Sequence, residues 1–280
     1  MASSEAVYCK QGWLAELQLG FTRRQGRSVL RHRLHQGPLM VQRPFYPEGE
    51  GCCHVYLLHP PGGVVGGDRL HLQVEVDSGA HALITVPAAG KFYRSGGEIA
   101  VQEQLLQVAT GGLLEWLPQE TIVFDGAEVE SLTRVELQAG ANFIGWEIVC
   151  MGRPASDALY RQGSMRQRFE IWRDGRPLFL ERSNWQGEGA EMVAHWGLRE
   201  RPVLGTMIIS ARFEEGLDGL RETLRELAGE FAMTQLPEVL VCRYLGEDSY
   251  QARQGFIKVW QQLRPLLAGR EVCIPRIWNT

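Results

Sequence analysis

Most of the chain before residue 212 alternates apolar and polar residues with a period of two. Over residues 69–77 the even-numbered positions are Leu or Val, whereas the odd-numbered positions are charged or polar. Over residues 13–21 the odd-numbered positions are apolar. In a strand this period places alternate side chains on opposite faces, so both segments are predicted to be half-buried strands. Related patterns predict further strands over 29–34, 55–58, 80–86, 98–108, 113–116, 121–124, 129–137 and 142–150.

A hairpin signal follows these strands. Asp174-Gly175 separates the segments 165–172 and 178–181, and this dipeptide is typical of the tight primed turns that join antiparallel strands. The body of the protein is therefore predicted to be mainly β, and mostly antiparallel sheet.

The pattern changes in the last quarter of the chain. Between Leu217 and Phe231 the apolar residues recur at steps of three and four, which predicts a helix with one apolar stripe. A second helix is predicted from an N-cap near Asp248-Ser249 toward Pro265, with a strand over 238–244 before it. We expect these helices to pack at one side of the sheets.

The composition is that of an ordinary globular protein. The 280 residues are 44% hydrophobic and 22% charged, with a net charge of -4. This balance argues against nucleic acid and anionic membranes as partners. No segment has the apolar run of a signal peptide or a membrane span, so a cytoplasmic location is expected. Without an internal repeat or a Ser/Pro-rich linker, residues 1–280 are predicted to form a single domain.

The glycine-rich stretch from His59 to Asp68 does not fit a nucleotide-binding loop. A phosphate loop needs Lys where Asp68 stands, and a dinucleotide fingerprint must open a helix, whereas residues 69–77 predict a strand. The glycines are therefore predicted to serve backbone geometry, through positive φ or close approach, and Asp68 to lie at the mouth of a sheet. The four glycines of this predicted structural turn are Gly62, Gly63, Gly66 and Gly67.

Glu147 is a single acid in an apolar strand. Over 143–150 both faces of the strand are otherwise apolar, which predicts burial on both sides. Because isolating an ionised carboxylate is costly, Glu147 is expected to pair, hydrogen-bond, protonate or contact trapped water. Two interpretations of Glu147 have equal weight: a structural ion pair with an arginine, and a functional role. Glu170 and Glu181, on the predicted hairpin strands, raise the same question.

Cysteine and histidine positions give weaker signals. Cys52 and His54 share one face of a strand, and with His59 nearby they could hold a borderline metal. We do not predict a stable metal site, because no second cluster supplies a fourth ligand. Covalent catalysis is not predicted either, since there is no G-x-S-x-G elbow. Free thiols are expected for the six scattered cysteines, Cys9, Cys52, Cys53, Cys150, Cys242 and Cys273.

Two segments are candidates for contact with a partner: one combines aromatic residues with cations, and the other is an apolar tail. Two cations flank two aromatics in Lys91-Phe92-Tyr93-Arg94, a combination that could grip an anion, a nucleic acid strand or an acidic partner. The mildly acidic chain has no second such cluster, so a protein interface is favoured. The tail 273–280 is too apolar for a free end and is predicted to dock on the body or on a partner.

Four motifs, in order and spacing, resemble the urease accessory protein UreD (UreH) family from about Trp13 to the end of the chain. The family's Gly-Gly-x-x-Gly-Gly-Asp falls on Gly62 to Asp68, and its Glu-Trp-Leu-Pro-Gln-Glu on Glu115 to Glu120. The other two are Thr85-Val86-Pro87 leading into 91–95, and Pro275-Arg276-Ile277-Trp278. One position departs, since Gly90 stands where the family usually has Ser or Thr, which puts a hydroxyl role there in doubt.

The resemblance implies a mainly β protein of helicoidal, sandwich-like sheets with a few helices. We predict that these sheets are antiparallel or mixed and that the helices lie in the C-terminal third of the chain. It also implies a non-catalytic scaffold that joins UreF and the GTPase UreG on apo-urease while nickel is installed. No tightly bound cofactor and no stable metal site is expected, although nickel could pass transiently. The candidate partner-binding residues are Lys91, Phe92, Tyr93, Arg94 and Trp278.

The acids set in apolar strands lead to a further hypothesis. A path lined by Asp68, Glu147 and Glu181 could pass nickel along, because oxygen ligands hold Ni²⁺ less tightly than thiolate or imidazole arrays. Two other function classes stay open. One is an enzyme that pairs Asp68 with Glu147 or Glu120 as acid and base, and the other is a generic β-sandwich binding module that needs no urease partner.

Overall fold

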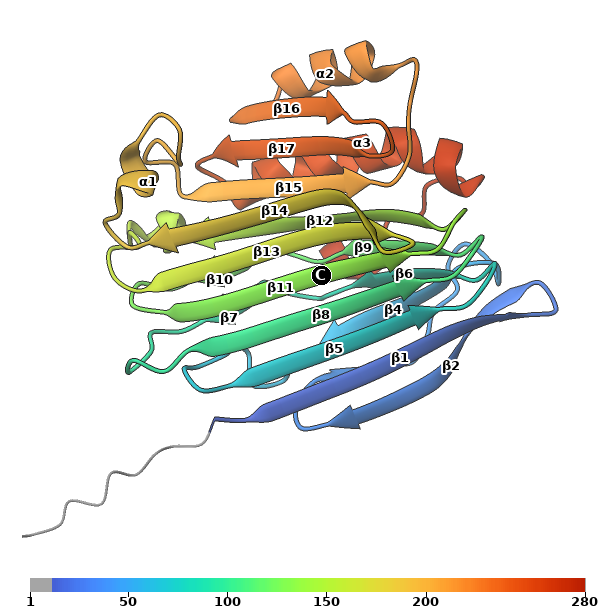
Figure 1. Cartoon of the computed structure of the whole chain (residues 1–280), viewed down its shortest axis with the longest axis horizontal. Helices are drawn as coiled ribbons and strands as arrows, with labels where there is room; N and C mark the ends of the chain where they lie inside the picture. The colour runs from blue at the N-terminus through green and yellow to red at the C-terminus, as the bar shows by residue number, and fades with distance from the viewer. Residues whose placement is uncertain (1–11, 280) are drawn as a thin grey trace, which may run out of the picture.

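Two large β-sheets form the body of the protein in this computed structural model, which describes residues 12–279 (Figure 1). The seven-stranded sheet has the order β14-β13-β11-β8-β5-β1-β2, and the ten-stranded sheet follows the path β16-β17-β15-β12-β9-β6-β4-β3, with β10 and β7 paired beside β12. The strands of the seven-stranded sheet are β1 (Leu14–Arg24), β2 (Arg27–Gln36), β5 (Arg69–Val76), β8 (Ala100–Val108), β11 (Glu128–Leu137), β13 (Ser164–Arg173) and β14 (Arg176–Gln186). Those of the ten-stranded sheet are β3 (Met40–Val41), β4 (Cys53–Leu58), β6 (His81–Thr85), β7 (Gly90–Phe92), β9 (Leu113–Leu117), β10 (Thr121–Val123), β12 (Asn142–Met151), β15 (Val203–Ile209), β16 (Glu230–Gln235) and β17 (Leu240–Gly246).

The chain winds from one sheet to the other and back. With the short β7 and β10 set aside, successive strands from β5 to β13 alternate between the sheets, and neighbours within each sheet run parallel. Tight turns at one end of the coil hold Gly79, Gly111 and Gly140 at φ values of 68°, 70° and 73°. These turns stack, since Gly79 donates its N–H to the Thr110 carbonyl (3.3 Å) and Gly111 to that of Gly140 (3.2 Å). This solenoid-like arrangement confirms the helicoidal, sandwich-like fold.

Mixed sheets, one of the two arrangements predicted, are confirmed, whereas the expectation of mostly antiparallel pairing was wrong for the centre of the molecule. Antiparallel pairs occur at its margins, in β1–β2, in β13–β14 and from β12 through β15 and β17 to β16. Alternation shows that one face of a strand is buried, but it does not encode the direction of the neighbouring strand. The predicted hairpin at Asp174-Gly175 is confirmed, with both residues at positive φ (48° and 75°) between β13 and β14.

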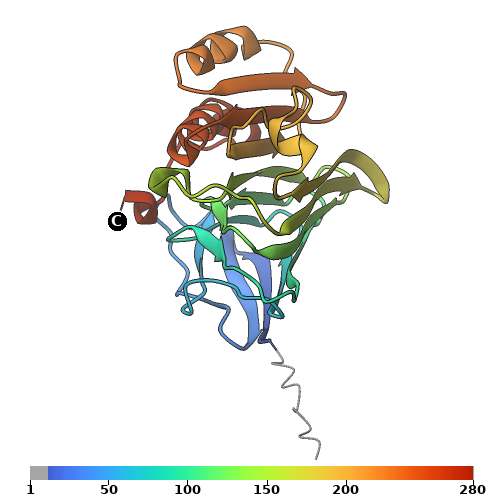
Figure 2. The same ribbon diagram turned by 90° about the vertical axis from the view of Figure 1, so that its left-hand side faces the viewer.

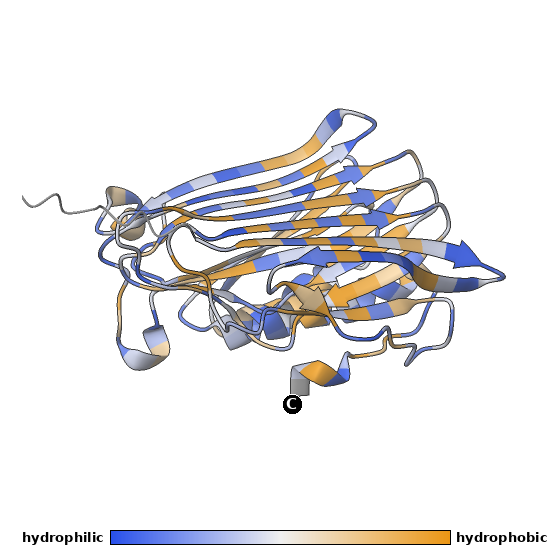
Figure 3. Cartoon of the chain, turned by 90° about the horizontal axis from the view of Figure 1, so that it is seen from below, coloured by the Kyte–Doolittle hydropathy of each residue, from blue (hydrophilic) through white to orange (hydrophobic). Residues whose placement is uncertain are grey.

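Two apolar cores lie on opposite faces of the ten-stranded sheet. The larger core fills the space between the two sheets and includes Phe21, Phe143 and Phe169. The second core lies under the helices and includes Trp146 and Trp260. Figure 2 shows the two main helices, coloured orange and red, beside the ten-stranded sheet, as predicted, and Figure 3 shows the alternating hydropathy along the strands. The same alternation sends Phe143 into one core and Trp146 into the other.

The helices depart from the sequence prediction at one place. The main helix, α3 (Ser249–Ala268), begins at the predicted N-cap, where the Asp248 carboxylate accepts the N–H of Tyr250 at 2.8 Å. The predicted helix from Leu217 ends early, because α2 spans Leu217–Arg225 and Phe231 lies in β16. Gly229, at a φ of 93°, breaks the helical path between them.

Three short helical segments complete the fold. They are α1 (Ala190–Val193), η1 (Pro154–Ser156) and η2 (Arg276–Asn279). Within residues 12–279, no helix has the length and apolar character needed to cross a membrane.

Candidate functional site: an intersheet cavity and a buried acid

A cavity of about 250 Å³ lies between the two sheets. Its lining extends from the glycine turn at Gly62 and Gly63 to Glu147 on β12. Apolar side chains from both sheets make up most of the wall. Amide and hydroxyl groups interrupt this wall at Gln102, Gln104, Ser131 and Gln167. The cavity is therefore apolar in the main, with polar groups on the seven-stranded sheet facing the Glu147 strand.

Glu147 points into this cavity from an otherwise apolar strand. Part of its side chain faces the empty space, so it retains some exposed surface, yet protein surrounds it on all sides. Gln167 donates its Nε2 to one carboxylate oxygen at 2.6 Å, and the Thr133 hydroxyl contacts the other. Within the described residues 12–279, no cation lies at ion-pair distance from Glu147, so the arginine partner weighed from the sequence is not formed.

The surroundings of Glu147 favour its neutral form. Burial raises its pKa to about 7, against the hydrogen bonds from Thr133 and Gln167, and the charge of Glu181 adds to the rise. The Thr133 hydroxyl has one proton but contacts two acceptors, Glu147 and the Gln104 amide oxygen at 2.7 Å. A protonated Glu147 resolves this conflict, because it donates to Thr133, which then donates to Gln104. The site is therefore set to exchange a proton near neutral pH.

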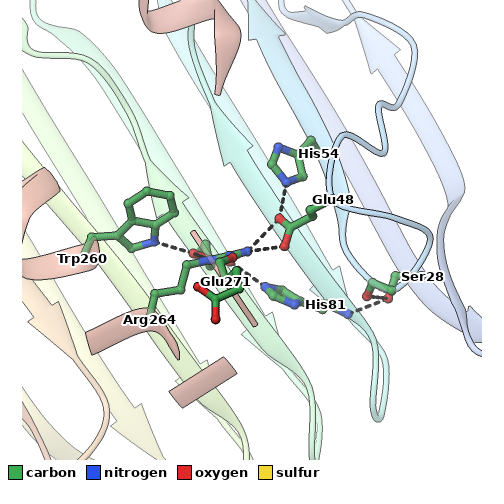
Figure 4. A network of polar contacts seen from close by, with 9 residues as sticks. Ser28, Glu48, His54, His81, Trp260, Arg264 and Glu271 are labelled. Atoms are coloured by element: carbon green, nitrogen blue, oxygen red, sulfur yellow. Dashed lines mark hydrogen bonds and ion pairs between the residues drawn. The ribbon is translucent and has the colours of Figure 1, made fainter. Parts of the chain in front are cut away.

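A second polar cluster lies on the opposite face of the ten-stranded sheet, under α3 (Figure 4). Its centre is Arg264, whose side chain is wholly buried. The Arg264 Nε is 3.0 Å from both oxygens of Glu115, and its Nη2 lies 2.7 and 2.9 Å from the two oxygens of Glu48. One guanidinium thus bridges two buried carboxylates from β9 and from the loop before β4.

Two histidines and a tryptophan complete this Arg264 cluster. The Nε2 of His54 lies 2.6 Å from Glu48, and that of His81 lies 2.6 Å from Glu115. The Trp260 indole donates to Glu115 at 2.6 Å. Burial alone would raise the pKa of both carboxyls, but the neighbouring histidine and Arg264 groups lower both to about 2. Both carboxylates are therefore ionised at neutral pH and must accept hydrogen bonds.

Asp68 stabilises the glycine turn. One carboxylate oxygen accepts the N–H of Trp13 at 2.8 Å, and the other accepts the N–H of Val65 at 3.0 Å. The side chain is almost completely buried, at the start of β5 as predicted. Both carboxylate oxygens of Asp68 are therefore engaged by backbone N–H groups.

The glycines of the turn have the geometric roles predicted for them. Gly62 and Gly67 adopt positive φ, at 77° and 89°. A Cβ on Gly63 would lie 2.2 Å from the Tyr93 ring, and one on Gly66 would lie 2.4 Å from the Ser95 Oγ. Positive φ is thus required at two positions and close approach at the other two.

We expect Gly63→Val to lower the free energy of unfolding by about 1–3 kcal/mol, because the new side chain must displace the Tyr93 ring. Urea denaturation of the purified chain measures this loss. Gly96→Val is the matched control, since nothing lies within 4 Å of its Cβ position and its φ is ordinary. Equal stability of the two variants would contradict a packing role for Gly63.

Comparison with known proteins identifies the family. The family model for "UreD urease accessory protein" matches residues 14–279. The chain belongs to the UreD family. The urease accessory protein UreD of Azoarcus sp. (strain BH72) is 46% identical over 271 residues, covering 96% of this chain and 95% of that protein. The UreD of Dechloromonas aromatica (strain RCB) is 43% identical over 273 residues, covering 96% and 95%, respectively.

Membership of the UreD family supports a role in urease maturation. The family is described as accessory, which is in keeping with a scaffold rather than a catalyst. Membership of the family therefore favours a role in urease maturation over the generic β-sandwich binding module.

The UreD-like segment Lys91 to Arg94 is partly buried. Phe92, in β7, belongs to the larger core, so its side chain is not on the surface. Tyr93 packs edge-on against Phe124, with ring centroids 4.8 Å apart. Lys91 lines the cavity, and Arg94 is exposed beside Asp125 at 2.7 Å. The partner-binding role of this segment stays a prediction, and within it Phe92 acts through packing.

The C-terminal tail docks on the body of the protein, one of the two outcomes predicted. The Trp278 ring packs against Trp146 and Trp260, with centroids 6.0 and 5.9 Å apart. Its indole N–H donates to the Thr85 hydroxyl at 2.8 Å. Ile274, in contrast, is 42% exposed. A role for Trp278 in partner binding stays a prediction.

The structure brings two of the three predicted path acids together. Glu181 accepts the Thr206 hydroxyl at 2.9 Å and pairs with Arg243 at 2.7 Å. Thr206 lies opposite Glu147 in the β12–β15 register, and Glu181 is close enough to raise the pKa of Glu147. Asp68 lies apart, at the glycine turn.

Two groups of polar residues were missed in the sequence. The first comprises Gln104, Thr133 and Gln167, which surround Glu147 but sit in ordinary alternating strands. The second is the Arg264 cluster. Glu115 carried a usable signal, because it is a lone acid in an apolar strand, like Glu147. Gly90 departs from the usual Ser or Thr of the family. A Cβ at this position would lie 3.6 Å from the Thr121 hydroxyl.

Proposed function

We propose that the chain is a non-catalytic scaffold that joins UreF, the GTPase UreG and apo-urease in the cytoplasm and assists nickel incorporation. We further propose that nickel passes through the intersheet cavity and contacts Glu147. No tightly bound cofactor is needed for this role, since the ion is cargo.

The observation that carries this proposal is a carboxyl group held in the intersheet cavity without a cationic partner among residues 12–279. Glu147 faces the amide groups of Gln104 and Gln167. Carboxylate and amide oxygens bind Ni²⁺ more weakly than thiolates or imidazoles. Such a site receives an ion in exchange for a proton and releases it again, which suits transfer rather than storage.

The other two acids extend the proposed path. His59 lines the cavity at the glycine turn. Burial lowers the pKa of His59, and the negative charge of Asp68 opposes this lowering. Glu181 lies beyond Glu147, on β14 at the edge of the seven-stranded sheet, and contacts Thr206 of β15 and Arg243 of β17. The proposed order is therefore Asp68, Glu147 and Glu181, with Glu147 as the step inside the protein.

Glu147→Gln tests the passage, because it retains the volume and hydrogen-bonding groups but removes the charge. Apo-urease is co-expressed with UreF, UreG and either chain, and the complex, its nickel content and urease activity are measured. We expect the complex to assemble and nickel in the recovered urease to fall roughly tenfold, as is typical when a group that supports metal binding is lost. Full nickel content with Glu147→Gln would contradict the passage while leaving the scaffold intact.

Glu170→Gln is the matched control, since Glu170 is a buried acid of β13 that does not line the cavity. We expect it to leave nickel delivery unchanged.

The folding of Glu147→Gln is tested separately, through the pH dependence of its stability. The folded pKa of about 7 exceeds the unfolded value of 4.5, so the stability of the wild-type protein falls as the pH rises from 4.5 to 7 and stays at the lower level above pH 7. The variant should therefore be more stable than wild type at pH 8, by up to about 3 kcal/mol, and equal to it below pH 4.5.

A further inference from the structure

Cys52 lies within the Arg264 cluster and is fully buried. One ligand atom each from Glu48, Cys52 and His54 lies within 4.8 Å of the others, and Cys52 forms a second such group with His81 and Glu115. The sequence offered Cys52 and His54 with His59 nearby, but the structure places His59 at the intersheet cavity. The fold supplies the missing groups, because it brings the loop before β4 together with β6 and β9.

We propose that Glu48, Cys52 and His54 bind one borderline divalent cation of the Zn²⁺ and Ni²⁺ class. Thiolate, imidazole and carboxylate are the ligands that these ions share, and three protein ligands leave a fourth position open. Metal bonds of about 2.0–2.3 Å place tetrahedral ligand atoms roughly 3.3–3.8 Å apart. The 4.8 Å group needs to contract slightly, and the 2.6 Å contact between His54 and Glu48 needs to open by about 1 Å.

The charge of the cluster favours this occupant. The carboxylates of Glu48 and Glu115 outnumber the single guanidinium of Arg264 by one. A divalent ion that replaces the thiol proton of Cys52 adds one net positive charge, which offsets this excess of carboxylates. Buried charges are stable when they are compensated in this way.

Glu48 is a better ligand than Glu115 on two grounds. Glu115 already accepts from His81, Trp260 and Arg264. The Glu48 side chain retains 8% exposure, whereas that of Glu115 has none, so an ion reaches Glu48 from outside. The Nδ1 of His54 is buried and has no hydrogen-bond partner among the described residues. Ligation through Nε2 fixes the imidazole proton on this Nδ1.

The test uses the purified full-length chain with Co²⁺ or Ni²⁺, both of which give thiolate-to-metal charge-transfer absorption in the near ultraviolet. We expect the band to reach its maximum at one ion per chain and bound metal to persist through gel filtration. Cys52→Ser should abolish the band and weaken binding at least roughly tenfold. Cys242→Ser is the matched control, since Cys242 is a buried thiol of the same core and belongs to neither of these ligand groups.

A second variant separates ligation from folding. His54→Gln retains a donor toward Glu48 but lacks the imidazole, so it should weaken binding while the apo-protein melts near wild type. Bound Zn²⁺ should raise the melting temperature of wild type but not of Cys52→Ser. A wild-type chain without the band, or a band that survives Cys52→Ser, would overturn the proposal. The site is separate from the cavity, so Glu147→Gln should leave the band unchanged, whatever happens to nickel delivery.

Discussion

Replacing Arg264 by methionine is expected to lower the free energy of unfolding by about 3–5 kcal/mol at pH 7. The change retains most of the volume of the side chain but leaves the carboxylates of Glu48 and Glu115 buried without their shared cation. Because a domain is stable by only about 5–15 kcal/mol in total, much of the variant is expected to misfold during expression. Urea denaturation with a chelator present measures the loss.

The matched control is Arg225→Met, on the exposed face of α2. Its side chain is 73% exposed and pairs with Glu222 one turn away, so the loss should stay within about 0.5 kcal/mol. A similar small loss for Arg264→Met would show that the cluster contributes little to stability.

The pH dependence of this variant has a defined sign. In the wild type, Glu48 and Glu115 have folded pKa values of about 2, below the unfolded value of 4.5. Their contribution to stability is therefore present above pH 4.5 and is lost as the pH falls toward 2. Without Arg264 the carboxylates lose their shared cation and keep only the contacts with His54, His81 and Trp260, so protonation relieves the buried charge. The deficit of Arg264→Met should therefore be smaller at pH 4 than at pH 7.

Truncation after Cys273 is expected to cost about 3 kcal/mol, chiefly through the loss of Trp278. Its ring packs against Trp146 and Trp260, and its N–H bonds Thr85, so removal exposes apolar surface of the second core. The expected results are a lower urea midpoint and a reduced yield of soluble complex with the urease partners. Unchanged denaturation would mean that the tail adds nothing to the fold.

Two point variants divide the effect of the tail. Ile274→Ala should change stability by less than about 0.5 kcal/mol, because Ile274 is 42% exposed. Trp278→Phe retains most of the ring packing but loses the hydrogen bond to Thr85, so it should cost about 1 kcal/mol. If Ile274→Ala reproduced the loss seen on truncation, the contribution assigned to Trp278 would be wrong.

Local patterns predicted those features that depend on neighbours in the chain. Alternation located β1, β5 and most later strands, and Asp174-Gly175 marked the hairpin correctly. The lone position of Glu147 in an apolar strand identified the acid of the cavity. The same reasoning extended α2 as far as Phe231, because periodicity alone did not show that Gly229 adopts a positive φ.

The sequence by itself determined the β character, the glycine turn, the N-cap of α3 and the family. Each of these features depends on residues that are close along the chain or on motifs of fixed order. Only the tertiary structure decided that the central strands run parallel. A short turn can connect a strand either to its neighbour in the same sheet or to a strand of the other sheet, and the local sequence does not distinguish the two. It also decided that Gln167 reaches Glu147 and that Arg264 joins Glu48 to Glu115. These contacts join residues far apart in sequence, and the winding of the chain sets which of them meet.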